Sequence, residues 1–192
     1  GKDVCVFDPS ETARADVEDY VAKAWATLEE IGLATTGRRG SLTFAETPEE
    51  AVAGADFIQE NVPERIDIKL DLYARIEPHL KPGCIVASSA SGLMVKEMQE
   101  GWKDPSNFVL GHPFNPPHLI PLVEIIGNEK TSPDAITAAE QFYAEVGKTT
   151  IRVNKEVPGH VANRLQAALW REALYLVREG VASVEDVDRA VW

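Results

Sequence analysis

The sequence is poor in cysteine and has no long apolar run. Only two cysteines, Cys5 and Cys84, occur among its 192 residues, and each lies in an apolar stretch. We therefore expect both thiols to be reduced, buried and unreactive, as in a cytoplasmic protein. No Cys/His cluster has zinc-ligand spacing, so no metal is expected. No apolar run approaches the roughly 20 residues that cross a membrane, and residues 1–8 show no signal-peptide pattern.

Positive charge is also scarce. Lys and Arg together number 19 against 31 Asp and Glu, which gives a formal net charge of −12. Proteins that coat nucleic acid or an anionic membrane need a basic face, so we expect neither partner. The hydrophobic fraction of 44% and the charged fraction of 26% are ordinary for a folded globular domain.

Short β-branched runs alternate with helical segments along most of the chain. This alternation predicts an α/β fold in which helices cover both faces of a doubly wound, mostly parallel sheet. Thr47 and Ser132 each precede a proline in a helix-start pattern, and the second helix is expected to end at Gly147. The predicted strands are Val4–Phe7, Leu42–Phe44, Phe57–Gln59, Cys84–Ala87, Phe108–Leu110, Leu122–Ile126 and Ile151–Val153.

The hydrophobic period changes after Pro158. Apolar residues between Val161 and Val177 follow helical spacing up to Gly180, and Ser183 then opens another helix. We therefore expect an α/β domain over residues 1–156 and the start of an all-helical domain over residues 157–192. A helical unit this short cannot bury the apolar faces of its own helices. We therefore expect the chain to be a fragment.

The first predicted strand ends in Asp8. In a dinucleotide-binding fold of the Rossmann type, an acidic residue at the end of the second strand binds the adenosine ribose, and its charge disfavours the 2′-phosphate of NADP. NAD is the cofactor expected on this interpretation, although an Asp before a proline is more often a turn residue. The sequence has no Gly-x-Gly-x-x-Gly turn, which belongs about 20 residues upstream. Residues 1–156 are thus expected to be a partial NAD-binding domain without its first strand and glycine loop.

Residues 111–117, Gly-His-Pro-Phe-Asn-Pro-Pro, predict a rigid loop after a strand, where α/β enzymes place ligand sites. Glu124 lies inside the next apolar strand, where a carboxylate needs a partner. A pair with His112 would meet that need, because the carboxylate would fix the imidazole tautomer and the ring could then take a proton from an alcohol. The alternative is a surface histidine with Glu124 on the exposed face of an edge strand. Spacing alone leaves both open.

Four motifs, in order, resemble the L-3-hydroxyacyl-CoA dehydrogenase superfamily. Residues 60–69 resemble its Glu-x-x-x-Glu-x-x-x-x-Lys segment, and residues 87–93 its Ser-Asn-Thr-Ser-Ser-Leu loop. Residues 112–116 with 122–124 resemble its catalytic segment, and residues 158–164 its Pro-Gly-Phe-x-x-Asn-Arg motif. The resemblance covers the whole chain. The superfamily includes L-carnitine dehydrogenases and the gulonate 3-dehydrogenase/lambda-crystallin branch.

The resemblance implies NAD-dependent oxidation of the 3-hydroxyl of an L-3-hydroxy acid or its derivative by a homodimer joined through the helical domain. His112 would be the general base and Glu124 its orienting partner, while Ser91 and Asn163 would bind substrate oxygens. The residues implied to line the cofactor are Asp8, Glu64, Lys69, Ser89 and Asn115.

Simpler structural roles are open for several of these residues. Asn163 could cap a helix, and Ser91 could shape a turn. Glu64 and Lys69 could be a solvated pair on a helix, although their i, i+5 spacing is poor for direct pairing.

The chain departs from the acyl-CoA pattern between Ser10 and Ser41. The acyl-CoA enzymes carry a longer, lysine-rich helical excursion there, whereas this segment is acidic and its cations are Arg14, Lys23, Arg38 and Arg39. The phosphates of CoA need several cations, so a small free acid is favoured over a thioester.

Residues 116–117 and 168–174 also resemble the carnitine and gulonate branches. Phe114 and Trp170 could hold a quaternary ammonium by cation–π contact, so we expect a small acid such as L-carnitine. The alternatives are an L-3-hydroxyacyl-CoA dehydrogenase, for 3-hydroxybutyryl-CoA in fatty acid metabolism, and a non-catalytic, crystallin-like structural protein.

Overall fold

The computed structural model describes residues 1–33 and 39–191, so Arg38 lies outside the described residues. The chain divides into two compact units, Gly1–Glu156 and Val157–Trp192, and each is described here by itself. None of the described helices is both long and apolar enough to cross a bilayer.

The first unit alternates strands with helices as the sequence predicts. Its strands are β1 (Val4–Val6), β2 (Leu42–Phe44), β3 (Phe57–Glu60), β4 (Ile85–Ser88), β5 (Phe108–Pro113), β6 (Leu122–Ile126) and β7 (Thr149–Val153). Its α-helices are α1 (Ala13–Glu30), α2 (Pro48–Val52), α3 (Ile66–Ile76), α4 (Val95–Met98) and α5 (Pro133–Glu145). Three short 3₁₀ turns are η1 (Glu77–His79), η2 (Gln99–Gly101) and η3 (Pro105–Asn107).

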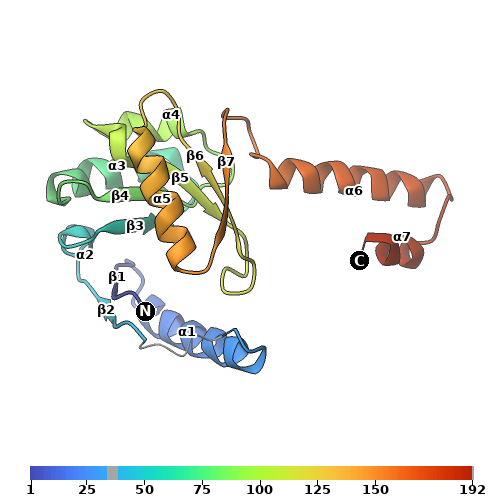
Figure 1. Cartoon of the computed structure of the whole chain (residues 1–192), viewed down its shortest axis with the longest axis horizontal. Helices are drawn as coiled ribbons and strands as arrows, with labels where there is room; N and C mark the ends of the chain where they lie inside the picture. The colour runs from blue at the N-terminus through green and yellow to red at the C-terminus, as the bar shows by residue number, and fades with distance from the viewer. Residues whose placement is uncertain (34–38, 192) are drawn as a thin grey trace. The chain divides into compact units, whose positions relative to one another are not determined.

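The strands form two hydrogen-bonded sheets (Figure 1). One has five strands in the order β3-β4-β5-β6-β7, in which only the β5–β6 pair is antiparallel. The other is the parallel pair β1–β2. The predicted α/β class with a mostly parallel sheet between helices is confirmed.

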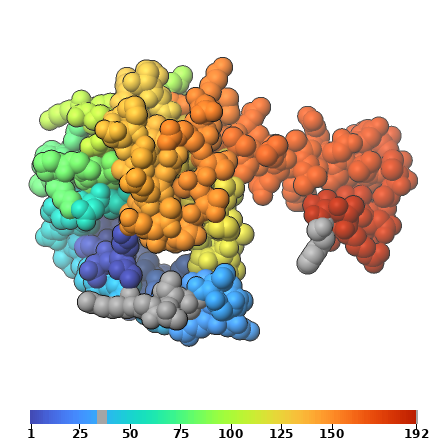
Figure 2. Space-filling view, in the orientation of Figure 1, coloured from blue at the N-terminus to red at the C-terminus, as the bar shows by residue number. Residues whose placement is uncertain are grey.

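Alternate residues of the five-stranded sheet face two separate hydrophobic cores. Val86, Phe108 and Leu110 pack in one core with Tyr73 of α3 and Met98 of α4. Ile85, Ala87 and Val109, which alternate with these residues along the strands, pack in the other core with α5. In Figure 1 α5 lies in front of the strands, and in Figure 2 its atoms, in gold to orange, form the surface on this side. Side chains alternate between faces along a strand, so both faces of this sheet are buried.

The predicted helix starts at Thr47 and Ser132 are confirmed. Thr47 accepts a hydrogen bond from the N–H of Glu50 at 3.2 Å, and Ser132 accepts one from the N–H of Asp134 at 3.2 Å. The helix α5 ends as predicted, because Gly147 takes a left-handed conformation with φ of +80°, which glycine adopts without steric cost.

The two cysteines lie in different surroundings. Cys84 is buried as expected, and burial raises the pKa of its thiol to about 11. The expectation that Cys5 is buried is wrong, because Cys5 lies exposed on the short two-stranded sheet. An apolar run of three strand residues does not by itself reveal whether a second layer covers it.

The second unit consists of two helices, α6 (Ala162–Arg178) and α7 (Val184–Val191). The predicted start at Ser183 is confirmed, since its hydroxyl accepts a hydrogen bond from the N–H of Asp186 at 3.1 Å. Several large apolar side chains of this unit are exposed, among them Leu165, Leu169 and Leu174.

A close approach between β5 and α5 predicts that Gly111 tolerates no side chain. A Cβ there would lie 2.2 Å from the Tyr143 hydroxyl oxygen and 3.1 Å from the Ala87 Cβ. We expect Gly111→Ala to lower the free energy of unfolding by about 2 kcal/mol, because overpacking a tight core costs about 1–3 kcal/mol. Denaturant titration would measure the loss. Gly54→Ala is the matched control, since nothing lies within 4 Å of its added Cβ; equal losses in both variants would contradict the close approach.

Candidate active site

The residues of the proposed site gather where three parallel strands end. The carboxyl ends of β3, β4 and β5 lie at the same edge of the sheet, because these strands are parallel neighbours. In open α/β sheets, ligands bind in the crevice outside the carboxyl ends of the strands. The loops that follow these strands carry most of the residues implied by the sequence.

His112 and Glu124 are direct cross-strand partners in β5 and β6. His112 Nδ1 lies 2.9 Å from Glu124 Oε2, and the carboxylate is fully buried. The interpretation of Glu124 as an exposed edge-strand residue is wrong, because β6 lies between β5 and β7. His112 lies inside β5, whereas the sequence suggested a loop. Antiparallel pairing therefore aligns both side chains on one face.

The carboxylate determines which imidazole nitrogen can act. Glu124 as a carboxylate accepts the hydrogen on Nδ1, which leaves the lone pair on Nε2. Phe114 packs edge-on against the imidazole, with ring centroids 4.7 Å apart. The arrangement can hold the ring in one orientation for proton transfer through Nε2.

Ser91 and Glu64 join the loops after β4 and β3. The Ser91 hydroxyl donates to Glu64 Oε2 at 2.7 Å, and the backbone N–H groups of Gly92 and Leu93 donate to Glu64 Oε1. Burial opposes ionisation of Glu64, but these hydrogen bonds outweigh it and hold the pKa of the carboxyl below its ordinary value of 4.5. Glu64 therefore fixes the shape of the loop that presents Ser91.

Lys69 is not part of a solvated pair with Glu64. Its ammonium is buried and lies 2.7 and 2.9 Å from the two carboxylate oxygens of Glu60. It also donates to the Val62 carbonyl at 3.2 Å, while Tyr73 and Ser88 donate to Glu60 Oε2 at 2.5 and 2.8 Å. Lys69 thus lies beneath the loop after β3, and its predicted cofactor contact stays a prediction.

This buried cluster contains three residues to which the sequence analysis assigned no role, although Glu60 and Ser88 fall within two of the quoted motifs. Glu60, Tyr73 and Ser88 are all at most 4% exposed. Burial raises the pKa of Tyr73, and the nearby Glu60 charge raises it further. Lys69 and Tyr73 are four residues apart on α3, so helical spacing could have placed them on one face.

The remaining predicted cofactor residues lie in surface loops. Ser89 follows β4 and donates to Asn61 Oδ1 at 2.5 Å, and Asn115 lies exposed in the loop after β5. Asp8 is exposed after β1 and accepts a hydrogen bond from the N–H of Ser10 at 2.8 Å. Asp8 therefore forms a turn, and its carboxylate is accessible to solvent.

Asn163 is the one predicted catalytic residue in the second unit. It lies in the first turn of α6 and is half-buried. Its predicted substrate contact stays a prediction.

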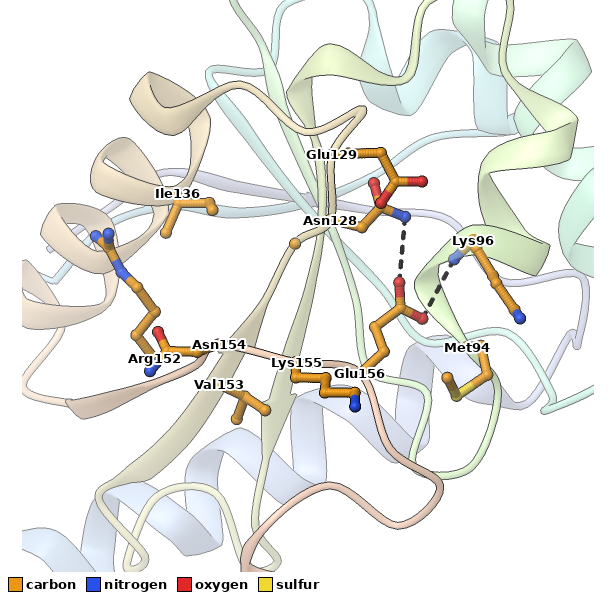
Figure 3. Close-up of a pocket in the computed structure, with 11 residues that line it drawn as sticks. Met94, Lys96, Asn128, Glu129, Ile136, Arg152, Val153, Asn154, Lys155 and Glu156 are labelled. Atoms are coloured by element: carbon orange, nitrogen blue, oxygen red, sulfur yellow. Dashed lines mark hydrogen bonds between the residues drawn. The ribbon is translucent and has the colours of Figure 1, made fainter.

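A hollow of about 510 Å³ lies elsewhere in the first unit (Figure 3). It opens beside Asn128, past the end of β6, whereas His112 lies toward the other end of that strand pair. Glu156 lines the hollow and accepts hydrogen bonds from Asn128 Nδ2 at 3.2 Å and from the N–H of Lys96 at 3.5 Å. This hollow is distinct from the candidate active site. Within residues 1–33 and 39–191, no group of three or more His, Cys, Asp or Glu is placed to hold a metal ion.

The Glu60–Lys69 pair predicts a large stability cost for Lys69→Met. Removing one partner of a buried ion pair leaves an uncompensated charge and costs roughly 3–5 kcal/mol. Lys23→Met is the control, because the exposed Lys23–Asp19 pair is worth at most about 1 kcal/mol. Unfolding free energies from denaturant titration would be compared. Adding Glu60→Gln to Lys69→Met should recover part of the loss, and no recovery would show that the charge is not the cause.

The hydrogen bonds to Glu64 predict a pH-dependent stability term. A carboxyl whose pKa is lowered on folding stabilises the protein above its unfolded pKa, and this contribution is lost as pH falls through the folded pKa. The stability difference between wild type and Glu64→Gln should therefore be largest at neutral pH and shrink below pH 4.5. Unfolding titrations at several pH values would measure it, with exposed Glu11→Gln as control. A difference that stays constant with pH would contradict the prediction.

Comparison with known proteins identifies the family. Residues 1–157 match the family model described as 3-hydroxyacyl-CoA dehydrogenase, NAD binding domain, and residues 159–192 match the model of its C-terminal domain. An L-carnitine dehydrogenase of Pseudomonas sp. is 49% identical over 191 residues, and one of Streptomyces coelicolor is 47% identical. Both alignments cover 100% of this chain and 60% of the relative. The chain thus spans about 60% of the length of these curated relatives.

Solved structures share the fold. The 5-formyl-3-hydroxy-2-methylpyridine 4-carboxylic acid 5-dehydrogenase, described as an NAD⁺-dependent dismutase, superposes with a TM-score of 0.88 at 36% identity. That match covers 98% of this chain and 61% of the other. FadB2 of M. tuberculosis superposes with a TM-score of 0.87 at 28% identity, over 100% of this chain and 68% of the other. The resemblance found in the sequence is confirmed, and the chain belongs to the 3-hydroxyacyl-CoA dehydrogenase family.

Proposed function

We propose that this chain forms the greater part of an enzyme that oxidises the 3-hydroxyl of a small L-3-hydroxy acid, L-carnitine above all, with NAD as the hydride acceptor. The observation that carries the proposal is the buried contact of 2.9 Å between His112 Nδ1 and Glu124 Oε2. A buried carboxylate is costly unless it is paired, and here its partner is an imidazole, the side chain that most often serves as a general base.

The polar groups of the loops at the sheet edge can hydrogen-bond parts of a dinucleotide. Ser89 and Asn115 are uncharged polar residues in the loops after β4 and β5, and Asp8 offers an exposed carboxylate suited to ribose hydroxyls. The bound dinucleotide would supply the hydride acceptor. Residues 1–156 are proposed as the dinucleotide-binding part of the enzyme and residues 157–192 as part of its substrate and dimerisation domain.

The residues of this chain would carry the proton. His112 Nε2 would take the proton of the 3-hydroxyl, and Glu124 would stabilise the imidazolium that forms. The Ser91 hydroxyl, which donates to Glu64 in this structure, would turn to donate to the substrate oxygen as the carbonyl develops, together with the Asn163 amide. The edge-on contact with Phe114 would keep the imidazole ring of His112 in one orientation during the proton transfer.

Two observations favour a small acid over a CoA thioester. The relatives at 47–49% identity are named L-carnitine dehydrogenases, and the structure at 36% identity is named for a small pyridine carboxylic acid. In the described part of residues 10–41, the cations Arg14, Lys23 and Arg39 already pair with acidic side chains. Phosphates of CoA would have to compete with these carboxylates.

The quaternary ammonium of carnitine suits the local chemistry. The ring of Phe114 lies beside His112, and an aromatic face attracts a trimethylammonium by cation–π interaction. The net charge of −12 disfavours the strongly anionic CoA thioester relative to carnitine, whose ammonium balances its carboxylate. Trp170 lies on the second unit and is 68% exposed, and its predicted contact with the ammonium stays a prediction.

Assembly and location follow from the same proposal. The exposed apolar residues of α6 and α7 include Leu165, Leu169, Trp170, Leu174, Val184 and Val191. Apolar patches of this kind mark association surfaces, and we propose that a second copy covers them in a homodimer. The cytoplasm is proposed as the compartment, in keeping with two free cysteines.

A substrate panel tests the function. The protein at the full length of its relatives would be assayed for NAD reduction with L-carnitine, L-gulonate and L-3-hydroxybutyryl-CoA. We expect L-carnitine to give the highest kcat/KM, and His112→Gln to lower kcat by about 10²–10⁴-fold, because general base catalysis contributes that much. His79→Gln is the matched control, since His79 is exposed in η1, and it should keep the wild-type rate.

Each other outcome has a definite meaning. Turnover of the CoA ester alone would overturn the small-acid proposal and favour a 3-hydroxyacyl-CoA dehydrogenase. NADH binding without turnover of any substrate would favour a structural protein on the same scaffold. Wild-type activity in His112→Gln would remove the proposed base.

A further inference from the structure

Gln59 connects three strands beneath the candidate active site, on the sheet face that α5 covers. Its amide nitrogen, Nε2, lies 2.8 Å from Ser89 Oγ and 3.2 Å from the Gly111 carbonyl oxygen. Its amide oxygen accepts a hydrogen bond of 2.5 Å from the Tyr143 hydroxyl on α5. The side chain thus touches the loop after β4 and the residue that immediately precedes His112.

The chemistry of the partners allows only one orientation of this amide. The Gly111 carbonyl can only accept, so the amide nitrogen must face it. The amide oxygen then faces Tyr143, whose hydroxyl must donate. Ser89 accepts from Gln59 and donates in turn to Asn61 Oδ1 at 2.5 Å. Every donor in the chain from Tyr143 to Asn61 therefore has a fixed direction.

Gln59 acts where the β4–β5 ladder stops. The register between these strands ends at the pair Ser88 and Leu110, so Gly111 lies one residue beyond it. The Gln59 amide, which reaches across from β3, donates to the Gly111 carbonyl at this point. The strand segment that carries His112 thereby stays tied to its neighbours past the end of the regular ladder.

Space around Gly111 supports the same arrangement. The Tyr143 hydroxyl oxygen lies only 2.2 Å from the place where a Cβ on Gly111 would be, so it fills the space that a side chain would need. Tyr143 is 5% exposed, and burial raises the pKa of its phenol, so it remains a donor at neutral pH.

We propose that Gln59, oriented by Tyr143, is a positioning residue that sets His112 and Ser89 relative to each other, and so couples the base to the cofactor loop. The inference rests on the proposed function and deepens it. Gln59 acts through the Gly111 carbonyl, next to His112, and through the Ser89 hydroxyl.

The peptide bond itself gives a direct readout. The sequence contains two Gly-His peptides, Gly111–His112 and Gly159–His160. Labelling glycine carbonyls with ¹³C and histidine amides with ¹⁵N isolates these pairs in a carbonyl–amide NMR correlation, and His112→Gln identifies the first signal by its loss. We expect Gln59→Met, which keeps the side-chain length, to shift the Gly111–His112 signal and leave the Gly159–His160 signal in place.

Kinetics of the same variants measures the consequence. In the full-length enzyme, Gln59→Met should lower kcat for L-carnitine and raise the Kd of NADH, each by about tenfold, because small misplacements of catalytic groups are costly. Gln99→Met is the matched control. Gln99 is also buried and hydrogen-bonded, to Thr131 and Asn128, and contacts neither loop. It should lose thermal stability but keep kcat and the Kd of NADH.

Tyr143→Phe keeps the ring and removes only the donor that orients the amide. It carries the test if Gln59→Met does not fold, and it should shift the same NMR signal and lower kcat by a smaller factor. An unchanged signal in the folded variants would overturn the proposal, as would a shifted signal with kcat and Kd within about twofold of wild type. A wild-type enzyme that binds no NADH and oxidises no substrate of the panel would instead contradict the proposed function.

Discussion

The rest of this candidate site depends on one constraint: a carboxylate buried inside the five-stranded sheet needs a hydrogen-bonding partner. Glu124 is fully buried in β6, and its Oε2 lies 2.9 Å from the imidazole of His112. The contact exists because β6 runs antiparallel to β5 and aligns the two residues in register. A shift by one residue would turn one side chain to the opposite face. The reversal of strand direction at β6 therefore brings His112 and Glu124 together.

Two polar networks support this pair from opposite faces of the sheet. On the face with α3, the Glu60–Lys69 ion pair holds the point where the loop after β3 begins. On the face with α5, Gln59 and Tyr143 hold the ends of β4 and β5. Buried polar networks with their partners in place confer rigidity. Adjacent residues of β3, Gln59 and Glu60, thus anchor the site from below on both sides, because neighbouring strand residues face opposite ways.

Sequence patterns predicted much of this arrangement, and particular residues show why. The strands and the starts of α2, α5 and α7 follow from β-branched runs and capping residues, which act over a few residues. The His112–Glu124 pair could be suggested because a carboxylate in an apolar strand demands a partner. Lys69 shows the opposite case: its partner proved to be Glu60 rather than solvent or Glu64. Which of several nearby carboxylates an ammonium meets depends on how a helix packs on the sheet.

The sequence by itself determined the family, the alternation of strands and helices, and the residue types available for proton transfer, because these depend on local propensity and on motif order. The tertiary structure alone decided that Cys5 is exposed, that Glu124 is internal to the sheet, and that Gln59 reaches Gly111 from two strands away. These facts depend on contacts between residues distant in the chain, and sequence spacing carries no measure of such distances.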